Sequence, residues 1–146
     1  MIFYTIYETA TGKILFTGTA DSEVAIAEMI SDGQDYVKKL SSDGKYVQDG
    51  QIVDMPPKPS EDYDFDYGSK SWVFDTPRAT NRALFKRNTL LADGPDRINP
   101  LWWASMTPEQ QADWKSYRQA LLDITDQPGF PMAIDWPNRP DAQKIE

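Results

Sequence analysis

The segment from 106 to 140 constrains the fold most, because a helix start, a periodic body and a helix stop follow one another along it. Thr107, with Pro108 and Gln110 after it, matches a capping box, in which two side chains satisfy the first free backbone N–H groups of a helix. Large apolar residues then recur at helical spacing, at Trp114, Tyr117, Leu121 and Ile124. We therefore predict an amphipathic helix of about four turns that ends before residues 127–129.

Proline governs the segment that follows this helix. Four prolines fall within residues 128–140, with large apolar side chains such as Phe130 and Trp136 between them. Proline lacks a backbone N–H and has a fixed φ, so the segment is neither a continuous helix nor a central strand. We predict that it runs extended against the preceding helix, with Trp114 and Trp136 in the core between the two.

The front half of the chain has the pattern of short strands. Residues 2–7 and 13–17 are rich in β-branched and aromatic residues, and the short loop between them contains Gly12, which predicts a hairpin. Asp21 or Ser22 is placed to cap a short helix over residues 23–31. Strand-like runs at 36–40, 45–47 and 51–53 are separated by Asp-Gly pairs, and we predict that they form a small meander.

Acidic and aromatic residues alternate after the proline-rich segment 56–59. Such a period of two places the aromatic residues on one face of a strand and the aspartates on the other. Gly68 then predicts a turn into a partner strand that ends near residue 74. A calcium loop is the alternative interpretation, but Tyr67 and Val73 stand where such a loop needs glycine and glutamate. The alternating residues are Asp62, Tyr63, Asp64, Phe65, Asp66 and Tyr67.

A second helix is predicted over residues 79–91, followed by a poorly periodic loop at 97–105. Arg78, Arg82 and Lys86 fall four apart and form a basic row, which we interpret as the wet face of the helix, with docking of an acidic strand as the alternative. The fold class is therefore α+β. A small antiparallel β-rich lobe with one short helix (1–75) precedes a helical lobe (76–146) that ends in the proline-rich extended segment.

The residue types that are absent from the sequence exclude several classes of function. The sequence has no cysteine and no histidine, so it lacks disulfides, the usual zinc ligands, a thiol nucleophile and the commonest general base. We accordingly expect no catalytic residues, no metal and no cofactor. The net charge of −8 repels nucleic acid and anionic membranes. No run of eighteen apolar residues and no secretory signal is visible, so we expect residence in a cytoplasm.

The run Arg87-Asn88-Thr89-Leu90-Leu91-Ala92-Asp93 resembles the entry motif of the phage tail fibre assembly chaperone family. The resemblance continues through Met106-Thr107-Pro108-Glu109-Gln110 with Trp114, and through Tyr117-Arg118-Gln119-Ala120-Leu121. It ends with Gln127-Pro128-Gly129-Phe130-Pro131 and Trp136-Pro137 with Pro140. The front half resembles the family's N-terminal lobe more loosely. The chain departs from the usual pattern at 93–96, after which its tryptophans arrive as Trp102-Trp103.

This resemblance implies a non-enzymatic bacteriophage protein that binds the C-terminal region of the tail fibre and assists its folding or trimerisation in the host bacterial cytoplasm. A permanent structural component of the virion tail fibre or baseplate is the alternative, and an enzyme that works with carboxylates is a third, weaker hypothesis. For Trp102 and Trp103, core and interface are equally good interpretations, because two adjacent tryptophans in a loop do not easily both face inward. The candidate partner-binding residues are Ile98, Leu101, Trp102, Trp103, Phe130 and Trp136.

Overall fold

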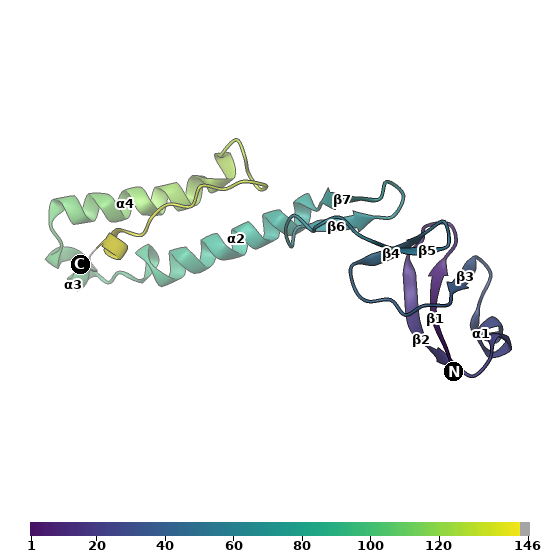
Figure 1. The fold of residues 1–146 in the computed structure, drawn as a ribbon. Helices are drawn as coiled ribbons and strands as arrows, with labels where there is room; N and C mark the ends of the chain where they lie inside the picture. Colours follow the sequence, from purple (N-terminus) through teal and green to yellow (C-terminus); the bar gives the residue numbers. More distant parts are fainter. Residues whose placement is uncertain (144–146) are drawn as a thin grey trace. The chain divides into compact units, whose positions relative to one another are not determined.

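The computed structural model describes residues 1–143 and confirms the α+β class, with antiparallel strands in the N-terminal half and helices in the C-terminal half (Figure 1). The chain divides into two compact units, Met1–Phe74 and Asp75–Glu146. Within residues 1–143, no helix has both the length and the apolar character that crossing a membrane requires. No three acidic, histidine or cysteine side chains gather there as a metal-binding group.

A three-stranded antiparallel sheet, in the order β2-β1-β3, forms the base of the N-terminal unit. Its strands are β1 (Ile2–Glu8), β2 (Ile14–Ala20) and β3 (Gln34–Val37). Gly12 makes the predicted turn between β1 and β2 with a φ of 73°, and a Cβ at this position would overlap the carbonyl oxygen of Val47. Glycine is therefore required there both by the backbone angle and by space.

Helix α1 (Glu23–Met29) covers one face of this sheet. Ser22 caps it, and the Ser22 hydroxyl accepts a hydrogen bond from the Ala25 N–H at 3.2 Å, which decides between the two predicted caps. Ile26 is fully buried against Tyr4 and Ile6 of β1. The core of the N-terminal unit therefore lies between α1 and the sheet.

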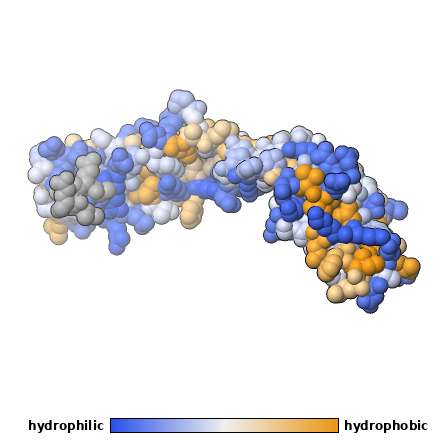
Figure 2. Space-filling view, in the orientation of Figure 1, coloured by the Kyte–Doolittle hydropathy of each residue, from blue (hydrophilic) through white to orange (hydrophobic). Residues whose placement is uncertain are grey.

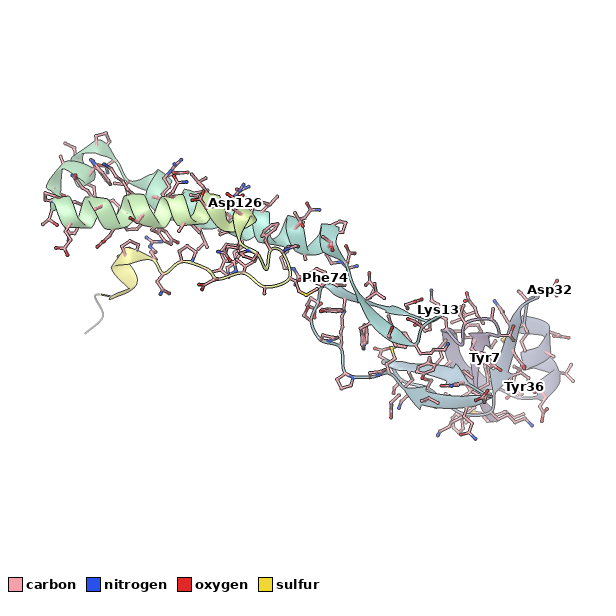
Figure 3. The ribbon with its side chains drawn as sticks, turned by 90° about the horizontal axis from the view of Figure 1, so that it is seen from above. Tyr7, Lys13, Asp32, Tyr36, Phe74 and Asp126 are labelled. Atoms are coloured by element: carbon pink, nitrogen blue, oxygen red, sulfur yellow. The ribbon has the colours of Figure 1, made fainter. Side chains whose placement is uncertain are left out.

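The predicted meander is wrong in its first strand. β4 (Lys45–Gln48) and β5 (Gln51–Asp54) do form a hairpin, turned at Asp49 and Gly50, which both have positive φ. However, β3 pairs with β1 and not with β4. The reason is packing, because Tyr36 of β3 is partly buried against the core under α1, and this contact holds β3 at the free edge of β1. Tyr36 of β3 and Tyr7 of the neighbouring β1 are both labelled in Figure 3.

The third pair of strands, β6 (Tyr63–Asp66) and β7 (Ser71–Phe74), confirms the predicted hairpin and its aromatic face. Phe65 packs edge-to-face on Tyr67 at 5.0 Å and on Trp72 at 5.3 Å between ring centroids. Asp64 and Asp66 are exposed on the opposite face. The alternation seen in the sequence thus separates an aromatic from an acidic surface, as a period of two requires.

The C-terminal unit consists of helices and an extended segment. Asp75 caps α2 (Thr76–Asp93), which is longer at both ends than predicted. Short 3-10 helices follow α2 and α4 and end the described chain: η1 (Pro95–Arg97), η2 (Asp123–Asp126) and η3 (Pro140–Gln143). The capping box of α4 (Pro108–Leu122) is confirmed: Thr107 Oγ1 accepts from the Gln110 N–H at 3.1 Å, and the Thr107 N–H donates to Gln110 Oε1 at 3.0 Å.

The core of this unit is built around the stripe of α4. Trp114, Tyr117 and Leu121 are buried together with Leu91 of α2, and the partly buried Trp136 of the extended segment packs against them. Figure 1 shows the segment after η2 running back along α4. The predicted extended run is only partly correct, because residues 128–132 form turns and the run ends at η3, which leaves residues 134–139 as its extended part.

The predicted loop at 97–105 is also wrong, because residues 100–105 form helix α3 (Pro100–Ser105). Asn99 caps this helix through a hydrogen bond that its Oδ1 accepts from the Trp102 N–H at 2.9 Å, and Pro100 occupies the first turn. The Asn-Pro pair is a helix start signal in its own right, but a helix of six residues is too short to show a period in the sequence.

Candidate functional site

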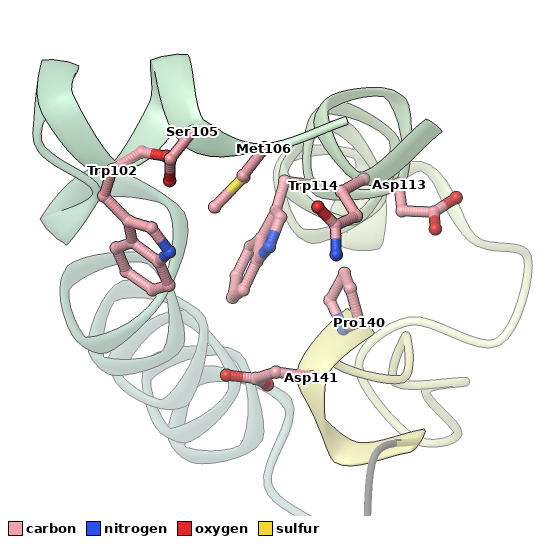
Figure 4. Close-up of a pocket in the computed structure, with 8 residues that line it drawn as sticks. Trp102, Ser105, Met106, Asp113, Trp114, Pro140 and Asp141 are labelled. Carbon is pink, nitrogen blue, oxygen red and sulfur yellow. The ribbon is translucent and has the colours of Figure 1, made fainter. Parts of the chain in front are cut away.

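A pocket of about 420 Å³ opens in the C-terminal unit where α3, the start of α4 and η3 meet (Figure 4). Helix α3 contributes one wall, the first two turns of α4 the back, and residues 140–141 the opposite side. Capping at both Asn99 and Thr107 fixes the ends of these two helices and so the shape of the pocket. The lining residues are Trp102, Ser105, Met106, Gln110, Asp113, Trp114, Pro140 and Asp141.

The apolar part of the pocket consists of two tryptophans and a methionine. Trp114 is 5% exposed and belongs to the core, whereas Trp102 is 43% exposed. Their rings meet edge-to-face with centroids 6.2 Å apart, and Trp114 makes a similar contact with Tyr117 at 5.9 Å. Met106, partly buried between α3 and α4, adds an adaptable side chain. The pocket therefore has a rigid aromatic floor and one exposed aromatic wall.

Polar groups surround this apolar floor. Asp141 Oδ1 accepts a hydrogen bond from Arg139 Nε at 2.6 Å, and the Arg139 guanidinium lies 5.4 Å from the Trp114 ring. Arg139 Nη1 also donates to the carbonyl oxygen of Asp93 at 3.3 Å, which ties the extended segment to the end of α2. Ser105, Gln110 and Asp113 complete the polar side. Such a combination suits a peptide side chain with a polar edge.

Burial raises the pKa of the Tyr117 hydroxyl above its ordinary value, while the nearby Arg139 opposes and Asp141 adds to this rise. Tyr117 therefore stays neutral at physiological pH and acts as a packing residue beneath the pocket. The side chains that line the pocket include no nucleophile paired with a base. What the arrangement offers chemically is a shaped contact surface.

The two adjacent tryptophans of α3 point in different directions. Trp102 lines the pocket, whereas Trp103 packs against the core, where its carbonyl oxygen accepts a hydrogen bond from Gln111 Nε2 at 2.8 Å. Leu101 is 86% exposed on the outside of α3, and Ile98 packs against the core. A helix separates neighbouring residues by about 100° around its axis, so one ring faces out when the other faces in.

The structure does not bring all six sequence-predicted partner residues together. Phe130 follows the far end of α4, a helix of fifteen residues that is about 22 Å long. Trp136 is partly buried against the core, and Lys86 Nζ lies 4.4 Å from the centroid of its ring. Neither residue lines the pocket. Leu101 and Trp102 therefore form the exposed apolar surface of α3, which we call the α3 surface.

Several residues of the pocket were not predicted as site residues. Asp113 and Trp114 lie three and four residues after Gln110 on α4, so the predicted helix already placed both on the same side as Gln110. Pro140 and Asp141 carry no such signal, because only the return of the extended segment brings them to the start of α4.

Residues 81–141 match the model of a family described as phage tail assembly chaperone protein. The matched segment contains α3, α4, the extended segment and every residue that lines the pocket. The searches of curated proteins and of solved structures gave no match. The family match suggests a non-enzymatic role and a phage tail protein as partner. It supports the phage tail assembly chaperone family for the helical part of this chain, in agreement with the resemblance seen in the sequence.

Proposed function

We propose that this protein is an assembly chaperone for a bacteriophage tail fibre, which binds the C-terminal, distal region of the fibre and assists its folding or trimerisation. The observation that carries the proposal is the pocket with its exposed Trp102, which lies entirely inside the segment that matches the chaperone family. The site of action is the host bacterial cytoplasm during assembly.

The α3 surface has the properties of an interface anchor. Leu101 and Trp102 are exposed side by side on a helix whose backbone is held by caps, so they lose little freedom when a partner binds. Tryptophan is among the residues that cost about 2 kcal/mol or more when truncated at protein interfaces. An apolar side chain of the fibre that enters the pocket would contribute about 1.5–3 kcal/mol by burial.

The rest of the molecule is compatible with temporary binding of a folding chain. The net charge of −8 opposes self-association, which a protein with exposed apolar side chains needs to avoid. Because the sequence has no cysteine, the chaperone does not form mixed disulfides with its client.

Co-expression with the fibre encoded by the same phage tests the proposal. We expect soluble, trimeric fibre and a co-purifying complex only when the chaperone is present. The Leu101→Ala, Trp102→Ala double variant should fold but lose the complex. Phe85→Ala is the matched control, because Phe85 is 76% exposed on α2 and does not line the pocket.

Two outcomes would contradict the proposal. Fibre that trimerises equally well without this protein would refute the chaperone role. Stoichiometric presence in purified particles without any effect on fibre folding would instead favour a permanent structural part of the tail.

A further inference from the structure

The pocket of the C-terminal unit adjoins a second hollow of about 330 Å³ farther along α4. Asp113 and Pro140 line both hollows, which together form a groove between α4 and residues 137–141 that we call the α4 groove. Ser116 and Ala120 extend its helical wall, three and seven positions after Asp113, which is the spacing of one helix face. From Asp113 to Ala120 the helix rises about 10 Å, the length of roughly three residues of an extended chain.

The charged groups that line the α4 groove are the carboxylates of Asp113 and Asp141. In Figure 4 the two carboxylates lie on different sides of the Trp114 ring. Asp141 is paired with Arg139. Asp113 is exposed, and no lysine or arginine among residues 1–143 forms an ion pair with it. The groove therefore presents a negative charge that the described part of the chain does not compensate.

Cations of the chain itself lie over most of its tryptophan rings. Of the five tryptophans, four have a lysine or arginine between 4.4 and 5.6 Å from the ring centroid. In the part of the chain that the structure describes, Trp102 has none, although its ring is 43% exposed and lines the pocket with Asp113. The face of an aromatic ring attracts a cation, so Trp102 and Asp113 together favour a cation from outside the chain. The four internal pairs are Lys58–Trp72, Lys86–Trp136, Lys115–Trp103 and Arg139–Trp114.

Arg139 shows how the groove holds a cation. Its guanidinium lies 5.4 Å from the centroid of the Trp114 ring, and its Nε donates to Asp141 Oδ1 at 2.6 Å. An aromatic face and a carboxylate thus bind one guanidinium at this site, in the manner of a charge-assisted hydrogen bond with a cation–π contact. Trp102 and Asp113 offer the same two kinds of group to a second cation.

We propose that the α4 groove selects a segment of the tail protein that carries a lysine or arginine beside its apolar anchor, with the cation bound by Trp102 and Asp113. The inference rests on the proposed function for the source of the segment. The long stem of either side chain packs its CH₂ groups on the ring while the charged end reaches the carboxylate. The net charge of −8 attracts such a segment at longer range.

The surface around the groove agrees with a partner that is not purely apolar. On the face drawn in Figure 2, hydrophilic surface covers much of the C-terminal unit and its hydrophobic areas are small. A partner of this unit therefore has to bind polar groups as well as apolar ones. A cation next to an apolar side chain meets both requirements, and it distinguishes the client segment from the exposed apolar segments of other unfolded chains.

Competition between two tagged forms of the full chain tests the proposal. Wild type and a variant with a different tag are co-expressed with the fibre, and the ratio of the tags in the captured complex measures their relative affinity. We expect Asp113→Asn to be captured about tenfold less than wild type. Asp126→Asn is the matched control, because it removes the same charge from an exposed aspartate of the same unit that lines neither hollow. Circular dichroism of the purified variants checks that both fold.

A photo-cross-linker identifies the chemistry of the bound segment. Ser116 is exposed in the second hollow, and p-benzoylphenylalanine in its place should cross-link the full chain to the fibre. We expect the cross-linked fibre segment to contain a lysine or arginine. Replacing that residue with glutamate should abolish binding to the wild-type chain and restore binding to the Asp113→Lys variant.

The outcomes separate this inference from the proposed function. Equal capture of Asp113→Asn and wild type, or a cross-linked fibre segment without lysine or arginine, would overturn the selection of a cation and leave the chaperone role intact. Cross-links that stay within the chaperone while the complex forms would also overturn it, because the chain itself would then cover the groove. The absence of any complex between the wild-type chain and the fibre would refute both proposals.

Discussion

The rings of Trp102 and Trp114 contact each other, yet truncating Trp114 should mainly reduce stability, whereas truncating Trp102 should mainly reduce fibre binding. A buried aromatic side chain removes about 200 Å² from water. Trp114, at 5% exposure, therefore buries roughly 190 Å² on folding. At about 25 cal/mol per Å², this burial stabilises the folded state by at most about 5 kcal/mol. Trp102, at 43% exposure, buries roughly 115 Å², which stabilises the folded state by at most about 3 kcal/mol. The difference of about 2 kcal/mol is large enough to measure.

Urea unfolding followed by circular dichroism at 222 nm reports mainly the C-terminal unit, because most helical residues lie there. We expect Trp114→Ala to lose about 3–5 kcal/mol of unfolding free energy. Trp102→Ala should lose about 1–2 kcal/mol, because a partly exposed ring leaves only a small cavity. The affinity for the fibre should show the reverse order in the folded variants: Trp102→Ala should weaken it about 30-fold and Trp114→Ala should weaken it less.

One result would refute this reasoning. If Trp102→Ala destabilises the protein as much as Trp114→Ala and fibre binding by the remaining folded protein is unchanged, Trp102 is a core residue and the pocket is not a partner site. Phe85→Ala serves as the baseline, since its ring is 76% exposed and its loss should change the unfolding free energy by about 1 kcal/mol or less.

Three further predictions concern the features that shape the two units. Thr107→Ala should cost about 1 kcal/mol in thermal unfolding because it removes the cap of α4, whereas Thr107→Ser should keep most of it. Gly12→Ala should destabilise the N-terminal unit by at least about 1 kcal/mol, because the alanine Cβ would overlap the Val47 carbonyl oxygen and the backbone φ is positive. Loss of the native β-sheet circular dichroism signal in urea measures this change. Hydrogen bonds lower the pKa of Asp66, mainly that from the Ser69 side chain and secondly those from the backbone N–H groups of the turn. The ionised Asp66 therefore stabilises the fold above its unfolded pKa, and this contribution is lost as the pH falls through the folded pKa. NMR titration of Ser69→Ala should show the Asp66 pKa rising toward its ordinary value, and an unchanged pKa would contradict this assignment.

Features that depend on neighbours within four residues were accessible from the sequence. The Thr107–Gln110 capping box, the Asp49-Gly50 turn and the aromatic face around Phe65 all depend on local hydrogen bonds or on the alternation of a strand, and each is confirmed. The α3 helix was missed for the opposite reason, because its signal is a single Asn-Pro start without a period behind it.

The tertiary structure decided the remaining features. Tyr36 packs against a core whose buried residues Tyr4 and Ile6 lie at the start of the chain, and this contact places β3 beside β1. The pocket joins α3 to Asp141 through the return of the extended segment.

The sequence by itself thus determined the α+β class, the helix start at Thr107 and the end of that helix before the proline-rich segment, because caps and proline act on the backbone nearby. Only the tertiary structure decided that Trp102 faces the pocket and Trp103 the core. That choice depends on how α3 is rotated against α4, and the rotation is set by packing between residues that are distant in sequence.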